Sequence, residues 1–209
     1  MVKRTSVVLL CLGLAGLAAG CGSSNRNAAS PPTGTTTTTT TTSSGSTQGA
    51  GALQAESQSA ATGDIPDNQV FVVLADPAAG YAIKYPEGWA QSGGGKRVVI
   101  RDKNNIVRVV VRPGRLPTTA AVGRVLTALP RVTVESPPAP HTLPSGPAVK
   151  VVYSTQSAPN AVTGKRVRLV VDRYYLARNG KLAIVDLGTP QGVDNVDAYR
   201  LMIESFRWS

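Results

Sequence analysis

The feature of this sequence that most constrains its fold is the dipeptide Asn179-Gly180, which separates two runs of β-favouring residues. The runs extend from Val167 to Arg178 and from Lys181 to Leu187. Asn and Gly both accept the positive φ angles of a type I′ turn, which joins adjacent antiparallel strands. The pattern therefore predicts a long β-hairpin in which Arg173 lies opposite Asp186 as a cross-strand ion pair. We expect this pair to be at the surface and to contribute little to stability.

A second hairpin is predicted between Val98 and Arg112. Two strands, Val98–Arg101 and Ile106–Arg112, flank the polar loop Asp102-Lys103-Asn104-Asn105. If this loop pairs Arg101 with Ile106, the alternation of side chains along a strand divides the hairpin into two faces. The face that points to the core then holds Val98, Ile100, Val107, Val109 and Val111, and the opposite face holds Arg97, Arg101, Arg108 and Arg112.

Four arginines on one face of a hairpin have two interpretations. They form either a charged, solvated surface that protects the sheet from aggregation, or a platform that binds anions. The second role suits arginine because a guanidinium group donates paired hydrogen bonds to phosphate and carboxylate groups. The formal net charge of the chain, +10, also favours anionic partners. The candidate anion-binding residues are therefore Arg97, Arg101, Arg108 and Arg112.

Two amphipathic helices are predicted beside the hairpins. Thr118 or Thr119 can cap the first helix, and Pro130 ends it. Its apolar residues at helical spacing are Val122, Val125, Leu126 and Leu129. Asp194 can cap the second helix, and Asp197 suits the positive end of its dipole. The apolar side of this helix holds Val196, Tyr199, Met202, Ile203 and Phe206.

The remaining segments complete an α+β domain. Tyr81–Tyr85 and Ala148–Ser154 are predicted strands, whereas the proline-rich segment Ser136–Pro147 is predicted to be a loop. Gly93-Gly94-Gly95-Lys96 is also predicted to be a flexible loop, because Arg97 follows the lysine where a phosphate-binding loop needs Ser or Thr. Hairpins and two amphipathic helices together predict a mainly antiparallel β-sheet covered by helices.

The start of the chain predicts export and lipid attachment. Lys3 and Arg4 precede an apolar run from Val7 to Leu17, which is a signal-peptide pattern. The run is about half of the ~20 residues that a membrane-spanning helix needs. Leu17-Ala18-Ala19-Gly20 before Cys21 resembles the lipobox of bacterial lipoproteins, which implies a diacylglycerol on the Cys21 thiol. Residues 1–20 are thus predicted to be a lipoprotein signal peptide, and the mature chain to lie on the outer face of the cell membrane or in the periplasmic space.

A polar segment separates Cys21 from the folded part of the chain. It is rich in Ser, Thr and Gly, and Thr35–Thr42 is an unbroken threonine run. Such a segment buries too little apolar surface to offset the entropy of ordering. Residues 21–63 are therefore predicted to be the lipidated cysteine and a disordered tether, and residues 64–209 to be one folded domain.

No catalytic or metal site is predicted in the domain. Cys11 lies in the signal peptide and Cys21 carries the lipid, so no thiol remains for a disulfide, a zinc site or a nucleophile. His141 is the one histidine, and no Gly-x-Ser-x-Gly elbow presents a serine. The aspartates lack the spacing of a calcium loop. We predict no enzymatic activity and no cofactor, and a metal site assembled from distant residues stays open.

Two segments resemble a known family. Gly80-Tyr81-Ala82-Ile83-Lys84-Tyr85-Pro86-Glu87-Gly88-Trp89 resembles the opening signature of PsbP-like domains, and the final helix ending Ile203-Glu204-Ser205-Phe206 resembles their last element. The resemblance spans the chain from Val70 to Trp208 and implies an α/β/α sandwich, here in a bacterial lipoprotein. Its best-known members are extrinsic photosystem II proteins that help to retain calcium and chloride, so calcium binding is implied by the resemblance alone.

These features favour a membrane-anchored extracytoplasmic lipoprotein whose domain is a non-catalytic binding or assembly module. The membrane is one partner through the lipid anchor, and anionic lipid, acidic cell-wall polymer or an envelope protein is the expected second partner. Export argues against nucleic acid. Two alternatives stay open: an envelope enzyme or cofactor carrier with a site that the sequence does not reveal, and a photosystem-II-type subunit that binds calcium.

Overall fold

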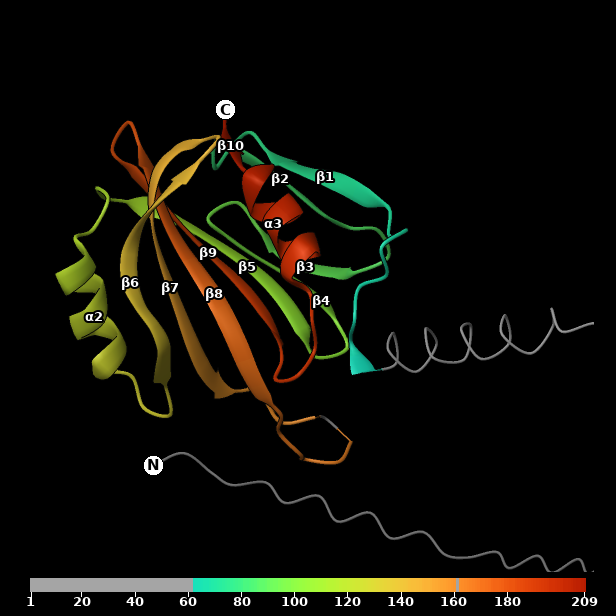
Figure 1. Cartoon of the computed structure of the whole chain (residues 1–209). Helices are drawn as coiled ribbons and strands as arrows, with labels where there is room; N and C mark the ends of the chain where they lie inside the picture. The colour runs from blue at the N-terminus through green and yellow to red at the C-terminus, as the bar shows by residue number, and fades with distance from the viewer. Residues whose placement is uncertain (1–61, 161) are drawn as a thin grey trace, which may run out of the picture. The chain divides into compact units, whose positions relative to one another are not determined.

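The computed structural model describes residues 62–160 and 162–209. They form a large and a small antiparallel sheet with helices packed against them (Figure 1). The α+β class predicted from the sequence, an antiparallel sheet covered by helices, is therefore confirmed. The predicted signal peptide, Cys21 and the predicted tether as far as residue 61 lie outside the described residues.

The large sheet has seven strands, and hairpin connections account for most of their order. β3, β4 and β5 are consecutive neighbours, as are β6, β7, β8 and β9, and the pairing of β5 with β9 joins the two groups. The strands lie in the order β3 (Ala90–Gly94), β4 (Arg97–Asp102), β5 (Asn105–Pro113), β9 (Lys181–Pro190), β8 (Arg168–Arg178), β7 (Gly146–Gln156) and β6 (Thr133–Leu143).

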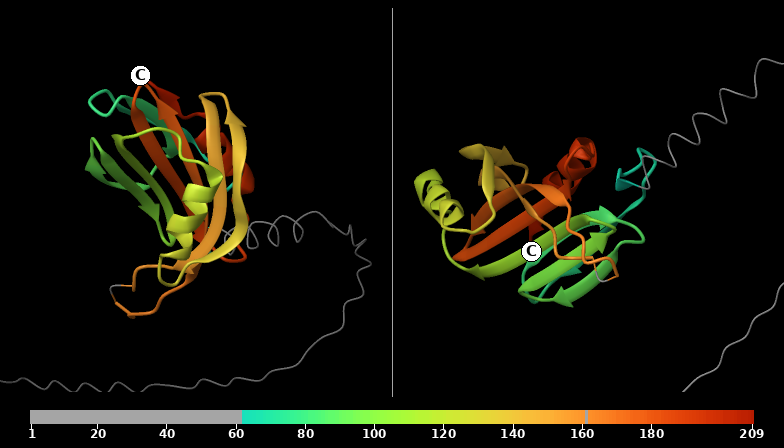
Figure 2. Two further views of the ribbon diagram at one scale, coloured as in Figure 1. Left: turned by 90° about the vertical axis from the view of Figure 1, so that its left-hand side faces the viewer. Right: turned by 90° about the horizontal axis from the view of Figure 1, so that it is seen from below.

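Each face of the large sheet carries its own hydrophobic core, because alternate side chains of a strand point to opposite faces. One face packs against helix α3 (Val196–Glu204) and the small sheet. The small sheet consists of β1 (Phe71–Asp76), β2 (Tyr81–Pro86) and β10 (Arg207–Trp208). The other face packs against helix α2 (Thr119–Thr127). Figures 1 and 2 show the two helices apart from each other, with strands of the large sheet between them.

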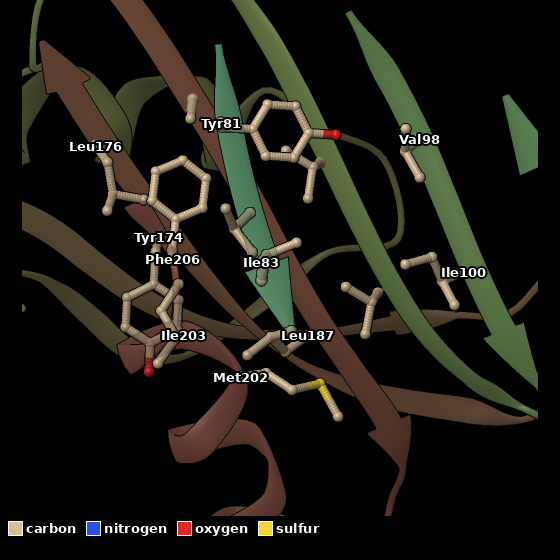
Figure 3. Close-up of a cluster of buried hydrophobic side chains, with 14 of the residues drawn as sticks. Tyr81, Ile83, Val98, Ile100, Tyr174, Leu176, Leu187, Met202, Ile203 and Phe206 are labelled. Carbon is tan, nitrogen blue, oxygen red and sulfur yellow. The ribbon is translucent and has the colours of Figure 1, made fainter. Parts of the chain in front are cut away.

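The larger core forms where β2, the large sheet and the end of the chain meet (Figure 3). Tyr81 and Ile83 of β2 are fully buried, and Phe206 is 1% exposed. The Tyr81 ring stacks on the Phe206 ring with 5.8 Å between centroids, and Trp208 meets Phe206 edge-on at 5.3 Å. Trp89 is buried as well. The buried residues of the segments that resemble the PsbP-like signature, Tyr81, Ile83, Trp89 and Phe206, are therefore packing residues in this fold.

The hairpin around Asn179-Gly180 is confirmed. Asn179 and Gly180 have φ angles of 50° and 75°, as a type I′ turn requires. Arg173 pairs with Asp186 in the predicted register. The first hairpin is also confirmed, since Arg101 pairs with Ile106. Its turn is tighter than predicted, because the ends of the four-residue loop pair with each other and only the two central residues connect the strands.

Helix α2 begins as predicted but buries a narrower stripe than its apolar pattern suggests. The Thr118 hydroxyl accepts a hydrogen bond from the Ala121 amide at 3.2 Å and so caps the helix. Val122 and Leu126 are buried, whereas Val125 is exposed. The helix ends at Thr127, earlier than the predicted end at Pro130, so the exposed Leu129 lies beyond it. Neither α2 nor α3 is long and apolar enough to cross a membrane, and no other helix in the described part of the chain is.

Helix α3 begins after Asn195 and not after the predicted cap, Asp194. The Asn195 side chain is buried and donates hydrogen bonds to the Thr189 hydroxyl at 2.9 Å and to the Asn105 side chain at 3.2 Å. Asp194 still accepts a hydrogen bond from the Val196 amide at 3.2 Å. Of the predicted apolar side, every residue except Val196 is buried.

Four strands lie where none is predicted, namely β1, β3, β6 and the two-residue strand β10 at the end of the chain. β6 occupies most of the proline-rich segment. Proline has no backbone N–H to donate to a neighbouring strand, and an edge strand such as β6 tolerates this because it has a neighbour on one side only. Two register shifts interrupt its pairing with β7. β3 ends in the predicted glycine loop, where Gly93 has a φ of 77° and a Cβ would clash with the carbonyl oxygen of Arg97. β1 pairs along its whole length with β2.

Candidate functional site

The four arginines predicted to bind anions lie on one face of β4 and β5. The predicted core residues of both strands are buried on the opposite face, so the predicted alternation is correct. Arg97, Arg101 and Arg112 are exposed, whereas Arg108 retains 31% of its side-chain exposure. The half-buried apolar residues between them are Val99, Ile106 and Val110.

A row of paired residues crosses this face of the large sheet. Arg108 of β5 pairs with Asp186 of β9, which pairs in turn with Arg173 of β8. Residues directly opposite each other on neighbouring strands point to the same face. Arg173 therefore shares this surface, which we call the arginine face and define as Arg97, Arg101, Arg108, Arg112 and Arg173.

The carboxylate of Asp186 holds both central guanidinium groups. Nε of Arg108 donates to Oδ2 at 2.9 Å, and Nη2 of Arg108 donates to the same oxygen. Nε of Arg173 donates to Oδ1 at 2.6 Å, and its Nη2 donates to Oδ2 at 3.0 Å. Asp186 is only 2% exposed. The expectation of a modest surface pair is therefore wrong, because the two arginines and the neighbouring side chains remove this carboxylate from water.

Two cations share this single anion, which leaves one positive charge in a largely buried setting. Burial opposes the charge of Arg173, but the hydrogen bonds and negative charge of Asp186 outweigh it and raise the pKa of Arg173. The Arg173 guanidinium lies 5.1 Å from the centre of the Tyr153 ring. Burial, followed by the charge of Asp186, raises the pKa of Tyr153 to about 12, so this phenol stays neutral. Each guanidinium carries five N–H donors, and Asp186 engages only those on Nε and Nη2.

The outer arginines of the face differ from the central pair. Among the described residues, no ion pair involves Arg97, Arg101 or Arg112. Helix α2 covers the adjoining part of the same sheet face through Val122 and Leu126. The arginine face thus combines a rigid central pair with three exposed cations, an arrangement that can bind several phosphate or carboxylate groups at once.

Acidic side chains gather on the other side of the large sheet, around α3. An open hollow of about 1330 Å³ lies there, and the described residues in its lining include only two lysine or arginine residues, Lys84 and Arg200. Its carboxylates are Asp64, Asp67, Asp194, Asp197 and Glu204. An anionic surface would attract the arginine face and repel this side, and would therefore orient the domain.

The sequence predicts the pair of Arg173 with Asp186, but not that Arg173 shares a face with the four hairpin arginines or that Arg108 binds the same carboxylate. The register of the Asn179-Gly180 hairpin places Arg173 beside Asp186, but only the pairing of β5 with β9 brings Arg108 to the same carboxylate. His141 lies exposed on β6, with its ring 5.6 Å from the Tyr174 ring. Within residues 62–160 and 162–209, no cluster of three or more His, Cys, Asp or Glu side chains is placed to hold a metal ion.

Comparisons with known proteins find similarity among solved structures. No family model matches the chain, and no curated protein matches it. Cyanobacterial PsbP (CyanoP) from Synechocystis is 17% identical with a TM-score of 0.44, over 70% of this chain and 98% of that protein. The Ran-binding protein Mog1p of Saccharomyces cerevisiae is 10% identical with a TM-score of 0.42, over 68% and 96%.

A third similar structure is a Bacteroides thetaiotaomicron protein, which is 11% identical with a TM-score of 0.42 over 66% of this chain. The match spans about half of that longer protein, 48% of its chain. These similarities concern the fold at low identity and do not make the chain a member of a specific family.

Proposed function

We propose that this chain is a lipid-anchored lipoprotein on the outer face of the cell membrane or in the periplasmic space, and that its domain is a non-catalytic module that binds anionic surfaces. The anchoring part rests on the signal-peptide pattern and on Cys21. The binding part rests on one observation: Arg108 and Arg173 share the buried carboxylate of Asp186, and the three arginines around them form no ion pair with any residue that the structure describes.

Part of the arginine face is fixed before any ligand binds, which supports this proposal. Side chains that are already fixed lose less entropy when they bind, and Asp186 fixes two of the five guanidinium groups. Near an anionic membrane, each basic residue contributes ~1 kcal/mol to binding. The candidate ligands are the phosphates and carboxylates of lipid headgroups or of acidic wall polymers.

The double substitution Arg97→Glu and Arg101→Glu is expected to weaken vesicle binding. The test uses residues 21–209 with Cys21→Ser, which cannot carry a lipid, and phosphatidylglycerol vesicles. Losing two contributions of ~1 kcal/mol predicts an affinity that is lower by roughly 30-fold or more. Raising the salt concentration from about 0.1 M to about 1 M, which shortens the Debye length from about 10 Å to about 3 Å, should release the unsubstituted chain as well. Co-sedimentation measures both effects.

The matched control is Lys84→Glu with Arg207→Glu, which makes the same charge change on exposed residues of the small sheet. Binding should then stay within about threefold of the unsubstituted chain, because these cations lie away from the arginine face. An equal loss of vesicle affinity in the two double variants, or binding that does not change with salt concentration, would contradict the proposal. Binding to acidic wall polymer but not to vesicles would identify the wall polymer, and not the membrane lipid, as the anionic partner. A reversal of Arg108 is unsuitable, since it would place a second carboxylate against buried Asp186.

The substitution Cys21→Ser in the full precursor is expected to abolish lipid attachment. The serine hydroxyl cannot take the place of the thiol, so cells should accumulate the precursor or release an unlipidated domain. Metabolic labelling with a radioactive fatty acid measures attachment directly, and Cys11→Ser is the matched control because Cys11 lies in the predicted signal peptide. Undiminished labelling of the Cys21→Ser chain would remove the lipoprotein part of the proposal.

A further inference from the structure

A cleft lies on the face of the large sheet that packs against α3, which is the face opposite the arginine face. It has a volume of about 480 Å³ and runs between α3 and strands β6 to β9. In Figure 1, α3 lies in front of the large sheet. The strand residues that line the cleft include Lys150 of β7 and Asp172 of β8. The volume falls within the range of about 300–1,000 Å³ that is typical of small-molecule sites.

The walls of this cleft are mainly apolar. Leu143, Val170 and Leu187 line it from the sheet, and Val193, Val196 and Ile203 line it from α3 and the loop before the helix. Val196 is 72% exposed, so the protein itself leaves part of the apolar side of α3 uncovered. Tyr174, which Figure 3 shows near Ile203, also lines the cleft. Walls of this composition suit an aliphatic group, because burial of its surface is favourable.

One end of the cleft is polar. Nζ of Lys150 on β7 lies 2.7 Å from Oδ2 of Asp172 on β8, and the Tyr174 hydroxyl donates to the same oxygen at 3.4 Å. Lys150 also lies 5.3 Å from the centre of the Tyr174 ring. Burial opposes the charge of Lys150, but its hydrogen bonds and the negative charge of Asp172 outweigh it and raise the pKa of Lys150. The ammonium group is therefore held in its charged form at the end of an apolar cleft.

The polar end of the cleft can donate hydrogen bonds to an anionic head group. Asp172 is neutralised by Lys150, and Arg200 at the rim pairs with Asp197. Glu204 adds one negative charge at the rim. A lysine ammonium has three N–H donors, and Asp172 needs only one. A second carboxylate can therefore bind Lys150 while Asp172 stays in place.

We propose that this cleft binds a small aliphatic carboxylic acid, with its chain between α3 and β8 and its carboxylate at Lys150. The site shares no residue with the arginine face and lies on the other side of the sheet. It therefore adds a second binding activity that does not depend on the proposed attachment to anionic surfaces.

The test compares decanoate with 1-decanol, which has the same chain length but no charge, by titration calorimetry on residues 21–209 with Cys21→Ser. Decanoate should bind at one site, and 1-decanol about tenfold more weakly, which is the effect of one charge-assisted hydrogen bond. Lys150→Gln keeps a donor for Asp172 but loses the charge, so it should weaken decanoate binding about tenfold and leave 1-decanol unchanged. The control Lys165→Gln removes an exposed lysine that does not line the cleft and should change neither affinity.

A substitution that fills the cleft tests its location. Val170→Trp should abolish the binding of both compounds, and Val193→Phe fills the cleft from the loop if urea unfolding shows that Val170→Trp is misfolded. The double variant Arg97→Glu and Arg101→Glu should bind decanoate normally, which separates this site from the arginine face. Equal affinity for decanoate and 1-decanol, undiminished binding in the folded cleft-filling variant, or no binding of decanoate would each overturn the proposal.

Discussion

Replacing Asp186 with alanine is expected to lower the free energy of unfolding by about 3–5 kcal/mol, the cost of removing one partner of a buried ion pair. Arg108 and Arg173 would then face each other across β9 without the carboxylate that neutralises them. Arg173 keeps only 14% of its side-chain exposure, so water cannot replace the lost partner. A domain of this size has a stability of about 5–15 kcal/mol, and the variant would therefore lose a large fraction of it.

Urea unfolding of the two proteins measures this loss, and Asp197→Ala is the matched control. Asp197 forms an exposed ion pair with Arg200 at 2.8 Å, and its removal should change the stability by less than about 0.5 kcal/mol. Similar losses in both variants would show that burial does not set the strength of the Asp186 pairs. The triple variant Arg108→Met, Asp186→Leu and Arg173→Met should regain much of the lost stability. It should still bind anionic vesicles less tightly, because two of the five cations are gone.

The hairpins were predictable because short-range rules determine them. Asn179-Gly180 specifies the type of turn, and the type of turn determines which residues pair along β8 and β9. The alternation in β4 and β5 likewise predicts which side chains point to the core. Both inferences use residues close in sequence, and the structure confirms them.

The burial of Asp186 could not be predicted in this way. It depends on the pairing of β5 with β9, and these strands are far apart in the sequence. Only this long-range register converts Arg108 from an exposed platform residue into a partner of Asp186. The same limit applies to β6, because composition suggests a loop and only its place at the edge of the sheet permits a proline-rich strand.

The cleft could not be predicted from the sequence for the same reason. Its polar end combines His141, Lys150 and Asp172 from three neighbouring strands, and its opposite wall comes from α3 near the end of the chain. No spacing in the sequence connects these residues. From the sequence alone, a single histidine in a proline-rich segment therefore does not indicate a binding site, although His141 lines the cleft.

Phe206→Ala is expected to lower the free energy of unfolding by about 3–5 kcal/mol, the usual cost of truncating a buried phenylalanine. Phe206 is 1% exposed and lies two residues after the end of α3, where its ring contacts Tyr81 of β2 and Trp208 of β10. Its loss would leave a cavity between α3 and the small sheet. It would also remove aromatic contacts that contribute about 0.5–1.5 kcal/mol each beyond burial.

The matched control is Leu201→Ala, which truncates a residue that is 40% exposed on α3 and should cost much less. Because Phe206 anchors the end of the helix that forms one wall of the cleft, its loss should also release α3 from the sheet in the folded protein. Amide hydrogen exchange should therefore speed up in α3 before it does in β8 and β9, whose pairing remains intact. A loss below about 1 kcal/mol, or exchange that speeds up equally in α3 and the central strands, would mean that the small sheet and α3 do not depend on this residue.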